Sequence, residues 1–209
     1  MKSYEISTDK QDCRDKLVEI TNQYIKVPKK VISLPSKTAM CIKTFRKHWP
    51  DTGYIGIERE EEDWKEICEQ GIDCYHSDIR QYIHAQTIPV QHCDLFFMDY
   101  YSYLSTEILG DIKALLNNRN LVHEGKTLIL GLTLAKAMRG NKENTLDFMR
   151  DYIDDGHRIE ITNSLENVEM ALVNYLGCEF PEINSISLEY SVEYLTGVPM
   201  YFLVFKIVK

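Results

Sequence analysis

The chain has 209 residues, of which 44% are hydrophobic and 27% are charged, as is usual for one globular domain with a full hydrophobic core. Its formal net charge of −8 at pH 7 argues against a broad basic surface for duplex nucleic acid, though not against a local basic cleft. No apolar run approaches the ~20 residues of a membrane helix and no signal peptide is apparent, so a cytoplasmic protein without a membrane partner is expected.

Hydrophobic periodicity predicts alternating helices and strands along the first 118 residues. The segment CDLFFM at 93–98 is typical of a central strand buried on both faces. Helices are expected at 9–26, 37–48, 60–70, 78–85 and 104–118, and strands at 30–34, 53–57, 73–76 and 93–98.

The second half continues this alternation and then changes character. A buried strand is expected at 125–132 and helices at 143–155 and 165–176. Two final strand-like runs flank a turn at 196–199, which predicts an antiparallel hairpin. Repeated strand–helix units imply an α/β fold, with a mostly parallel sheet covered by helices on both faces. We expect a single domain, in which residues 1–29 form a helical extension and residues 30–209 the core.

The six cysteines do not indicate a metal site. None forms a CxxC pair, and the C-x5-C-x-H spacing of Cys68, Cys74 and His76 is not usual for zinc. Reduced and mostly buried thiols are therefore expected.

Residues 31–60 are the most informative segment, because they read as strand, tight turn, helix and a second strand ending in an acid. That order opens a nucleotide-binding α/β unit. The turn Ser33-Leu34-Pro35-Ser36-Lys37-Thr38 contains no glycine. Its end echoes a P-loop, but the preceding residues are already strand, so there is no room for the full phosphate-binding motif. A nicotinamide oxidoreductase also finds little support, because its glycine fingerprint is absent.

The order of elements over residues 30–209 resembles that of class I S-adenosylmethionine-dependent methyltransferases. The resemblance implies a Rossmann-like three-layer sandwich, with a seven-stranded sheet whose last strand inserts antiparallel. In that family the first strand ends in an acidic, glycine-rich turn, which lets the backbone approach the cofactor closely. By this resemblance Ser33 takes the acidic position, and Pro35, Ser36 and Lys37 lie in the cofactor loop.

The resemblance also assigns the ends of the next two strands to S-adenosylmethionine. Glu58, followed by Arg59, matches the acid that binds the ribose hydroxyls, while Asp78 and Ile79 match the residues at the adenine amine and ring. Each position has a structural alternative. Glu58 begins an acidic run that suits a helix N-terminus, and Ser77 or Asp78 suits the N-cap of the next helix.

The fourth strand ends in Met98-Asp99-Tyr100-Tyr101. Methyltransferases acting on exocyclic amines carry D/N/S-P-P-Y/F here, which offers acceptors for the amine hydrogens and an aromatic ring for stacking. By this resemblance Asp99, Tyr100 and Tyr101 are the candidate catalytic residues. The alternative is a loop-capping aspartate, with the tyrosines packed on the following helix.

These features lead to two functional hypotheses. The first is a methyltransferase that uses S-adenosylmethionine on an amine of a nucleic acid or a small molecule. The second is a catalytically inactive scaffold of the same fold that serves as a binding or structural subunit, for which a protein partner is possible. The basic segment 135–142 could contact an anionic substrate, although solvated lysines are the simpler interpretation.

Overall fold

The computed structural model describes residues 8–87, 91–136, 152–153 and 164–209. Seven strands form one sheet in the order β3-β2-β1-β4-β5-β7-β6. The first five pair in parallel, whereas β7 lies antiparallel between β5 and β6. The strands are β1 Lys30–Ser33, β2 Gly53–Glu58, β3 Cys74–His76, β4 Leu95–Asp99, β5 Thr127–Ala135, β6 Ser185–Leu195 and β7 Pro199–Val208. The mostly parallel sheet and its closing hairpin confirm the predicted α/β fold.

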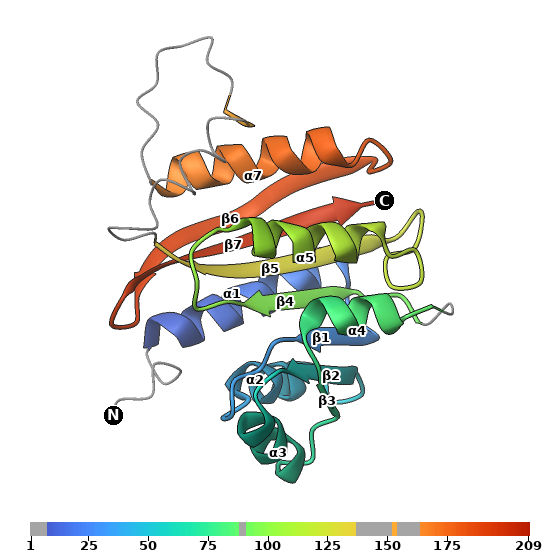
Figure 1. The fold of residues 1–209 in the computed structure, drawn as a ribbon, viewed down its shortest axis with the longest axis vertical. Helices are drawn as coiled ribbons and strands as arrows, with labels where there is room; N and C mark the ends of the chain where they lie inside the picture. Colours follow the sequence, from blue (N-terminus) through green and yellow to red (C-terminus); the bar gives the residue numbers. More distant parts are fainter. Residues whose placement is uncertain (1–7, 88–90, 137–151, 154–163) are drawn as a thin grey trace.

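Helices cover both faces of this sheet, with α4 and α5 on one face and α1 on the other (Figure 1). One buried cluster lies under α4, α5 and α7, and a second lies under α1 and α2. The described helices are α1 Thr8–Tyr24, α2 Met40–His48, α3 Glu61–Glu69, α4 Ile79–Ala85, α5 Thr106–Asn117 and α7 Leu165–Glu179. The predicted helix at 143–155, apart from residues 152–153, and the basic segment at 135–142, apart from residues 135–136, lie outside the described residues, so they stay predictions.

The central strands are positioned by burial on both faces. Leu95 to Met98 of β4 are all buried, and seven consecutive residues of β5, from 128 to 134, are buried as well. Helix α1 comes close to the sheet because Gly131 of β5 has no side chain. A Cβ there would lie 3.0 Å from Cδ2 of Leu17 and 2.9 Å from Cδ2 of Phe97. The N-terminal helix is thereby packed onto the two strands that lead to the candidate site.

Helix α2 begins three residues later than the periodicity predicts. Ala39 has a φ of 49°, in the left-handed region, and Met40 is the first helical residue. A non-glycine residue in that conformation cannot continue a right-handed helix. Residues 34–39 therefore form a connecting loop between β1 and α2.

The described part of the chain contains neither a membrane-spanning helix nor a cluster of metal-binding side chains. None of its helices combines the length and apolarity needed to cross a membrane. None of its His, Cys, Asp and Glu side chains gather in groups of three or more that could hold a metal ion.

Candidate functional site

A crevice of about 610 Å³ lies at the carboxyl edge of the sheet. Parallel strands present their carboxyl ends at one edge, where α/β folds commonly bind ligands. The crevice brings together seven of the eleven residues predicted from the sequence, namely Glu58, Arg59, Asp78, Ile79, Asp99, Tyr100 and Tyr101.

A smaller hollow of about 310 Å³ shares Leu34, Glu58, Asp99 and Tyr101 with the crevice and extends along the β1–α2 loop. Two more predicted residues, Pro35 and Ser36, line it. The Ser36 hydroxyl is buried and has no hydrogen-bond partner among the described residues. An orphaned polar group costs free energy when buried, so a ligand in this hollow would gain by pairing with it.

Ser33 and Lys37 are not brought to either hollow. The Ser33 side chain is buried, with its Oγ 3.2 Å from Sγ of Cys41. Lys37 is exposed, and its backbone carbonyl accepts a hydrogen bond of 2.7 Å from Gln70. The position that is acidic in methyltransferases is here occupied by a side chain directed into the packing under α2.

The β1–α2 loop packs closely against β2 at Gly56. A Cβ on Gly56 of β2 would lie 3.0 Å from Cγ of Pro35 and 2.9 Å from Sγ of Cys74. Both distances are shorter than ordinary carbon contacts, so Pro35 can lie across β2 only because residue 56 lacks a side chain. The close packing in this region therefore depends on a glycine in the strand.

Glu58 ends β2 and lines both hollows. Its Oε1 accepts a 2.8 Å hydrogen bond from the backbone N–H of Glu60, which turns the chain toward α3. Burial raises the pKa of the Glu58 carboxyl, while the backbone N–H groups of Glu60 and Arg59 oppose that shift. A half-buried carboxylate facing a hollow is suited to accept hydrogen bonds from ligand hydroxyls.

Asp78 combines a position in the crevice with a structural role. Its Oδ1 accepts a 2.8 Å hydrogen bond from the backbone N–H of Arg80, which makes Asp78 the N-cap of α4. The N-cap role that the sequence suggested as the structural alternative for Asp78 is therefore present. Ile79, the first residue of α4, is buried beside it and also lines the crevice.

Asp99 ends β4, and both of its carboxylate oxygens have partners. Thr133 of β5 donates to Oδ1 at 2.5 Å, and Nζ of Lys10 lies 2.9 Å from Oδ2. Lys10 was not predicted from the sequence to be part of the site. The sequence did hold a sign of its burial, because Lys10 lies on the same helical stripe as Cys13 and Leu17, which are core residues of α1.

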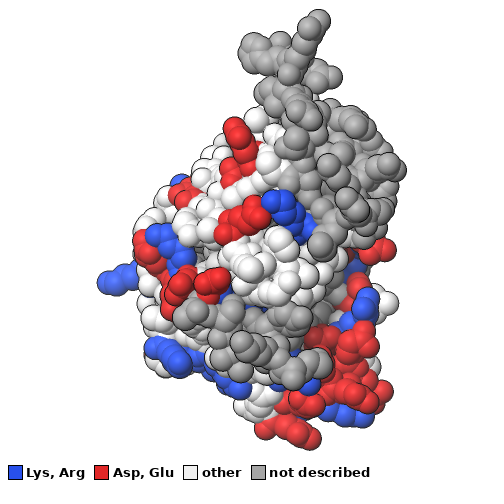
Figure 2. Space-filling view, turned by 90° about the vertical axis from the view of Figure 1, so that its left-hand side faces the viewer, with Lys and Arg blue, Asp and Glu red and all other residues white. Residues whose placement is uncertain are grey.

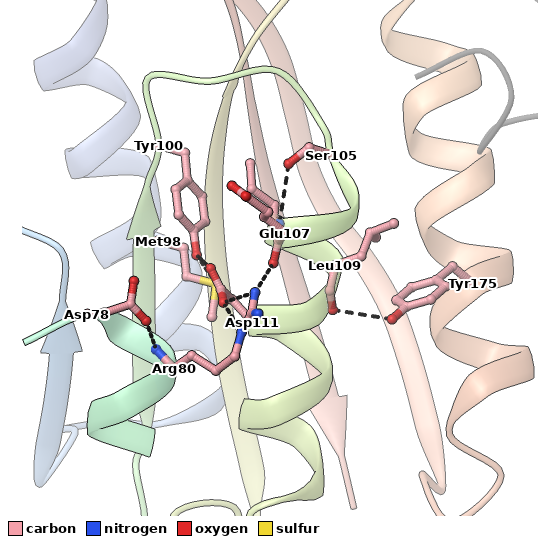
Figure 3. A network of polar contacts seen from close by, with 10 residues as sticks. Asp78, Arg80, Met98, Tyr100, Ser105, Glu107, Leu109, Asp111 and Tyr175 are labelled. Atoms are coloured by element: carbon pink, nitrogen blue, oxygen red, sulfur yellow. Dashed lines mark hydrogen bonds and ion pairs between the residues drawn. The ribbon is translucent and has the colours of Figure 1, made fainter. Parts of the chain in front are cut away.

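Tyr100 and Tyr101 lie in different environments although they are adjacent. Tyr100 donates a 2.7 Å hydrogen bond to Oδ2 of Asp111, whose Oδ1 accepts one of 2.9 Å from Nε of Arg80 (Figure 3). Burial and the Asp111 carboxylate raise the pKa of the Tyr100 phenol. Its hydroxyl therefore bridges to α5, whereas Tyr101 is 48% exposed at the mouth of the crevice.

Asp111 is a second residue that the sequence analysis missed. It lies on the buried face of α5, between Ile108 and Leu115, and is 7% exposed. Burial raises the pKa of its carboxyl, against the hydrogen bonds from Tyr100 and Arg80. An acid on an apolar helical stripe was the signal, since such a residue needs partners.

Carboxylates dominate the charge of the crevice. The one basic residue among its lining residues, Arg59, pairs with Glu60 at 3.1 Å in a solvent-exposed contact. Figure 2 views the carboxyl edge and shows acidic side chains gathered at its lower right, toward the end that carries α3. The carboxylates lining the crevice are those of Glu58, Glu60, Asp78, Asp99, Glu107 and Asp111.

A larger hollow of about 690 Å³ lies between α4 and α5 and is lined by Arg80, Lys113 and Arg119 rather than by acids. It reaches the C-terminal end of α5, away from the strand ends that carry Glu58 and Asp99. The smaller, acidic crevice is therefore the better candidate for chemistry, because the predicted residues converge there.

Solved structures that match this fold include methyltransferases. The N-methyltransferase NodS from Bradyrhizobium japonicum WM9 has a TM-score of 0.55 and 10% identity, over 98% of this chain and 99% of its own. An O-methyltransferase from Bacillus cereus, solved with S-adenosylhomocysteine, has a TM-score of 0.58 and 9% identity, over 99% and 84%. The putative methyltransferase yhhF from Escherichia coli has a TM-score of 0.56 and 8% identity, over 97% and 87%.

The chain therefore has the class I methyltransferase fold, as the order of its elements predicted. No family model matches the sequence, and no curated protein sequence is significantly similar to it. At these identities the likeness extends to the fold alone, so the function is argued from the crevice.

Proposed function

We propose that this protein binds S-adenosylmethionine in the crevice at the carboxyl edge and transfers its methyl group to an acceptor. The observation that carries the proposal is the convergence of Glu58, Asp78 and Asp99, which come from the ends of three different chain segments and line one cavity. A fold alone would not require three acids at these positions.

The residues present fit such a cofactor. Glu58 offers a carboxylate to the ribose hydroxyls, and Asp78 and Ile79 offer an acceptor and an apolar surface to the adenine. Ser36, whose hydroxyl is buried without a partner, would hydrogen-bond the methionine end in the smaller hollow. The acidic crevice also favours a molecule that carries a sulfonium and an ammonium group.

When bound, S-adenosylmethionine supplies an electrophilic methyl group. The chain would contribute orientation of the acceptor and exclusion of water, which lower the barrier by pre-organisation. Of the three candidate catalytic residues, Tyr101 is the one at the mouth of the crevice. Tyr100 would act as a positioning residue through Asp111, because its hydroxyl is committed to that carboxylate.

Calorimetric titration with S-adenosylmethionine and S-adenosylhomocysteine tests this proposal. We expect micromolar dissociation constants for the wild type and binding at least ~10-fold weaker for Glu58→Ala, since loss of a charged hydrogen-bond acceptor costs about 1.5–3 kcal/mol. Glu62→Ala is the matched control, because Glu62 is an exposed acid of α3 that lines neither hollow.

Two observations favour a second function, that of a binding scaffold without catalysis. Both oxygens of Asp99 are already engaged, and Pro35 occupies a loop that is glycine-rich in active methyltransferases. No calorimetric signal for either cofactor up to millimolar concentration would favour this second function.

A further inference from the structure

Asp99 and Tyr101 together form an ammonium-binding site, and the protein fills it with its own Lys10. Nζ of Lys10 lies 2.9 Å from Oδ2 of Asp99 and 2.9 Å from the Tyr101 hydroxyl oxygen. It also lies 4.4 Å from the centroid of the Tyr101 ring. A carboxylate combined with an aromatic face is the chemistry that recognises organic ammonium groups.

This contact is buried and joins distant parts of the chain. The side chains of Lys10 and Asp99 are 2% and 4% exposed, and the hydrogen bond from Lys10 to Tyr101 spans 91 residues. Burial disfavours the charge on Lys10, but the Asp99 carboxylate and the Tyr101 hydroxyl outweigh that cost and raise its pKa. Lys10 therefore stays an ammonium group without a free lone pair, which makes it an occupant of the site rather than a nucleophile.

The same site faces the crevice. Asp99 and Tyr101 line both hollows at the carboxyl edge, and about half of Tyr101 is exposed to solvent. A small ammonium compound that entered the crevice would reach the same carboxylate and the same ring as Lys10 does. Because Lys10 is the third residue of α1, only the first turns of this helix would have to move to vacate the site.

We propose that the crevice recognises a primary alkylammonium group between Asp99 and Tyr101, and that Lys10 is the internal competitor for this site. The inference rests on the proposed function in one respect, namely that the compound anchored by its ammonium group is the methyl acceptor. Because an ammonium nitrogen has no lone pair, the methyl group would go to another, nucleophilic atom of that compound. Lys10 then limits access, because an acceptor binds only to the fraction of molecules in which Lys10 has left.

Titration with n-butylammonium chloride tests the proposal, since this ion reproduces a lysine side chain beyond its Cα. We expect Lys10→Met to bind it at least ~10-fold more tightly than the wild type. If Lys10 occupies about 90% of the sites, only about one tenth of the wild-type molecules can bind the ion, and removing Lys10 frees the rest. Lys16→Met is the matched control, because Lys16 is a more exposed lysine of the same helix that pairs with Glu19. Sodium chloride at the same concentration controls for ionic strength.

Hydrogen exchange on the wild type provides a second measurement that needs no variant. Saturating n-butylammonium should accelerate exchange of the backbone N–H groups at 12–16, because displaced Lys10 no longer holds the first turns of α1. Equal affinity of wild type and Lys10→Met, or unchanged exchange in α1 at saturation, would overturn the proposal. If Lys10→Met does not fold, Lys10→Gln replaces it, since glutamine keeps hydrogen-bonding capacity without charge.

Calorimetry with S-adenosylhomocysteine on the same proteins separates the two proposals. Cofactor binding without binding of n-butylammonium to Lys10→Met refutes the ammonium site and leaves the proposed function intact. Ammonium binding without cofactor binding supports the site and refutes the proposed function.

Discussion

Gly56→Ala should destabilise the protein by introducing a methyl group where the β1–α2 loop crosses β2. The new Cβ would lie 2.9 Å from Sγ of Cys74 and 3.0 Å from Cγ of Pro35, both inside normal contact distance. Overpacking of this kind costs about 1–3 kcal/mol, because the neighbours must move or adopt strained rotamers. For a domain of this size, that loss corresponds to roughly 2–12 °C in the melting temperature.

Urea and thermal denaturation measure this loss, and Gly177→Ala is the matched control. Gly177 lies in α7, where an added Cβ would meet nothing within 4 Å, so alanine should stabilise the helix by up to ~1 kcal/mol. Adding Cys74→Ala to Gly56→Ala should recover part of the loss, since it removes the closest atom, and a double-mutant cycle measures that coupling. A Gly56→Ala protein within about 0.5 kcal/mol of the wild type would refute the packing argument.

Three further predictions concern the site and its surroundings. Lys10→Met should lower the free energy of unfolding by about 3–5 kcal/mol in urea denaturation, because it leaves the buried Asp99 carboxylate without its ion partner; a loss similar to that of Lys16→Met would contradict this. Glu58→Gln should raise the melting temperature at pH 7 but not at pH 3. Because burial raises the pKa of the Glu58 carboxyl in the folded protein, the protonated carboxyl stabilises the fold below the carboxyl's ordinary pKa, and this stabilisation is lost as pH rises through the raised pKa. The neutral glutamine therefore removes a penalty that is present at pH 7 and absent at pH 3. Equal gains at both pH values would exclude that origin. Iodoacetamide at pH 8 should label the exposed Cys68 and Cys178, as followed by mass spectrometry, and leave Cys74, whose pKa burial raises to about 12; rapid labelling of Cys74 would show that the loop opens.

Much of the fold could be predicted from the sequence because its signals are local. The apolar runs of β4 and β5 reveal buried strands, and the final hairpin follows from two β-rich segments around a turn. The start of α2 was misplaced by three residues, because the left-handed backbone at Ala39 has no clear signature in an alanine. Local patterns thus identify elements better than they identify element ends.

Only those site residues that lie at the ends of strands could be predicted from the sequence. Glu58, Asp78 and Asp99 were located by their positions at the carboxyl edge, whereas the partners of Asp99 come from α1 and β5, 89 and 34 residues away in sequence. The sequence also could not separate Tyr100 from Tyr101. Tyr100 contacts α5, whereas Tyr101, in the bend that follows β4, contacts Lys10 of α1.

The position of β7 in the sheet has a consequence for how the chain folds during synthesis. This strand leaves the ribosome after every other strand, yet it lies between β5 and β6 and pairs with each of them along its length. Among the described strands β6 pairs only with β7, so until β7 emerges β6 lacks that partner, and β5 exposes one edge of a strand that is almost entirely apolar. Such an edge is a site of mispairing between nascent chains. The sheet is therefore completed late, after β7 has been translated. Until then, correct folding requires that the exposed edge of β5 does not pair with another copy of the chain.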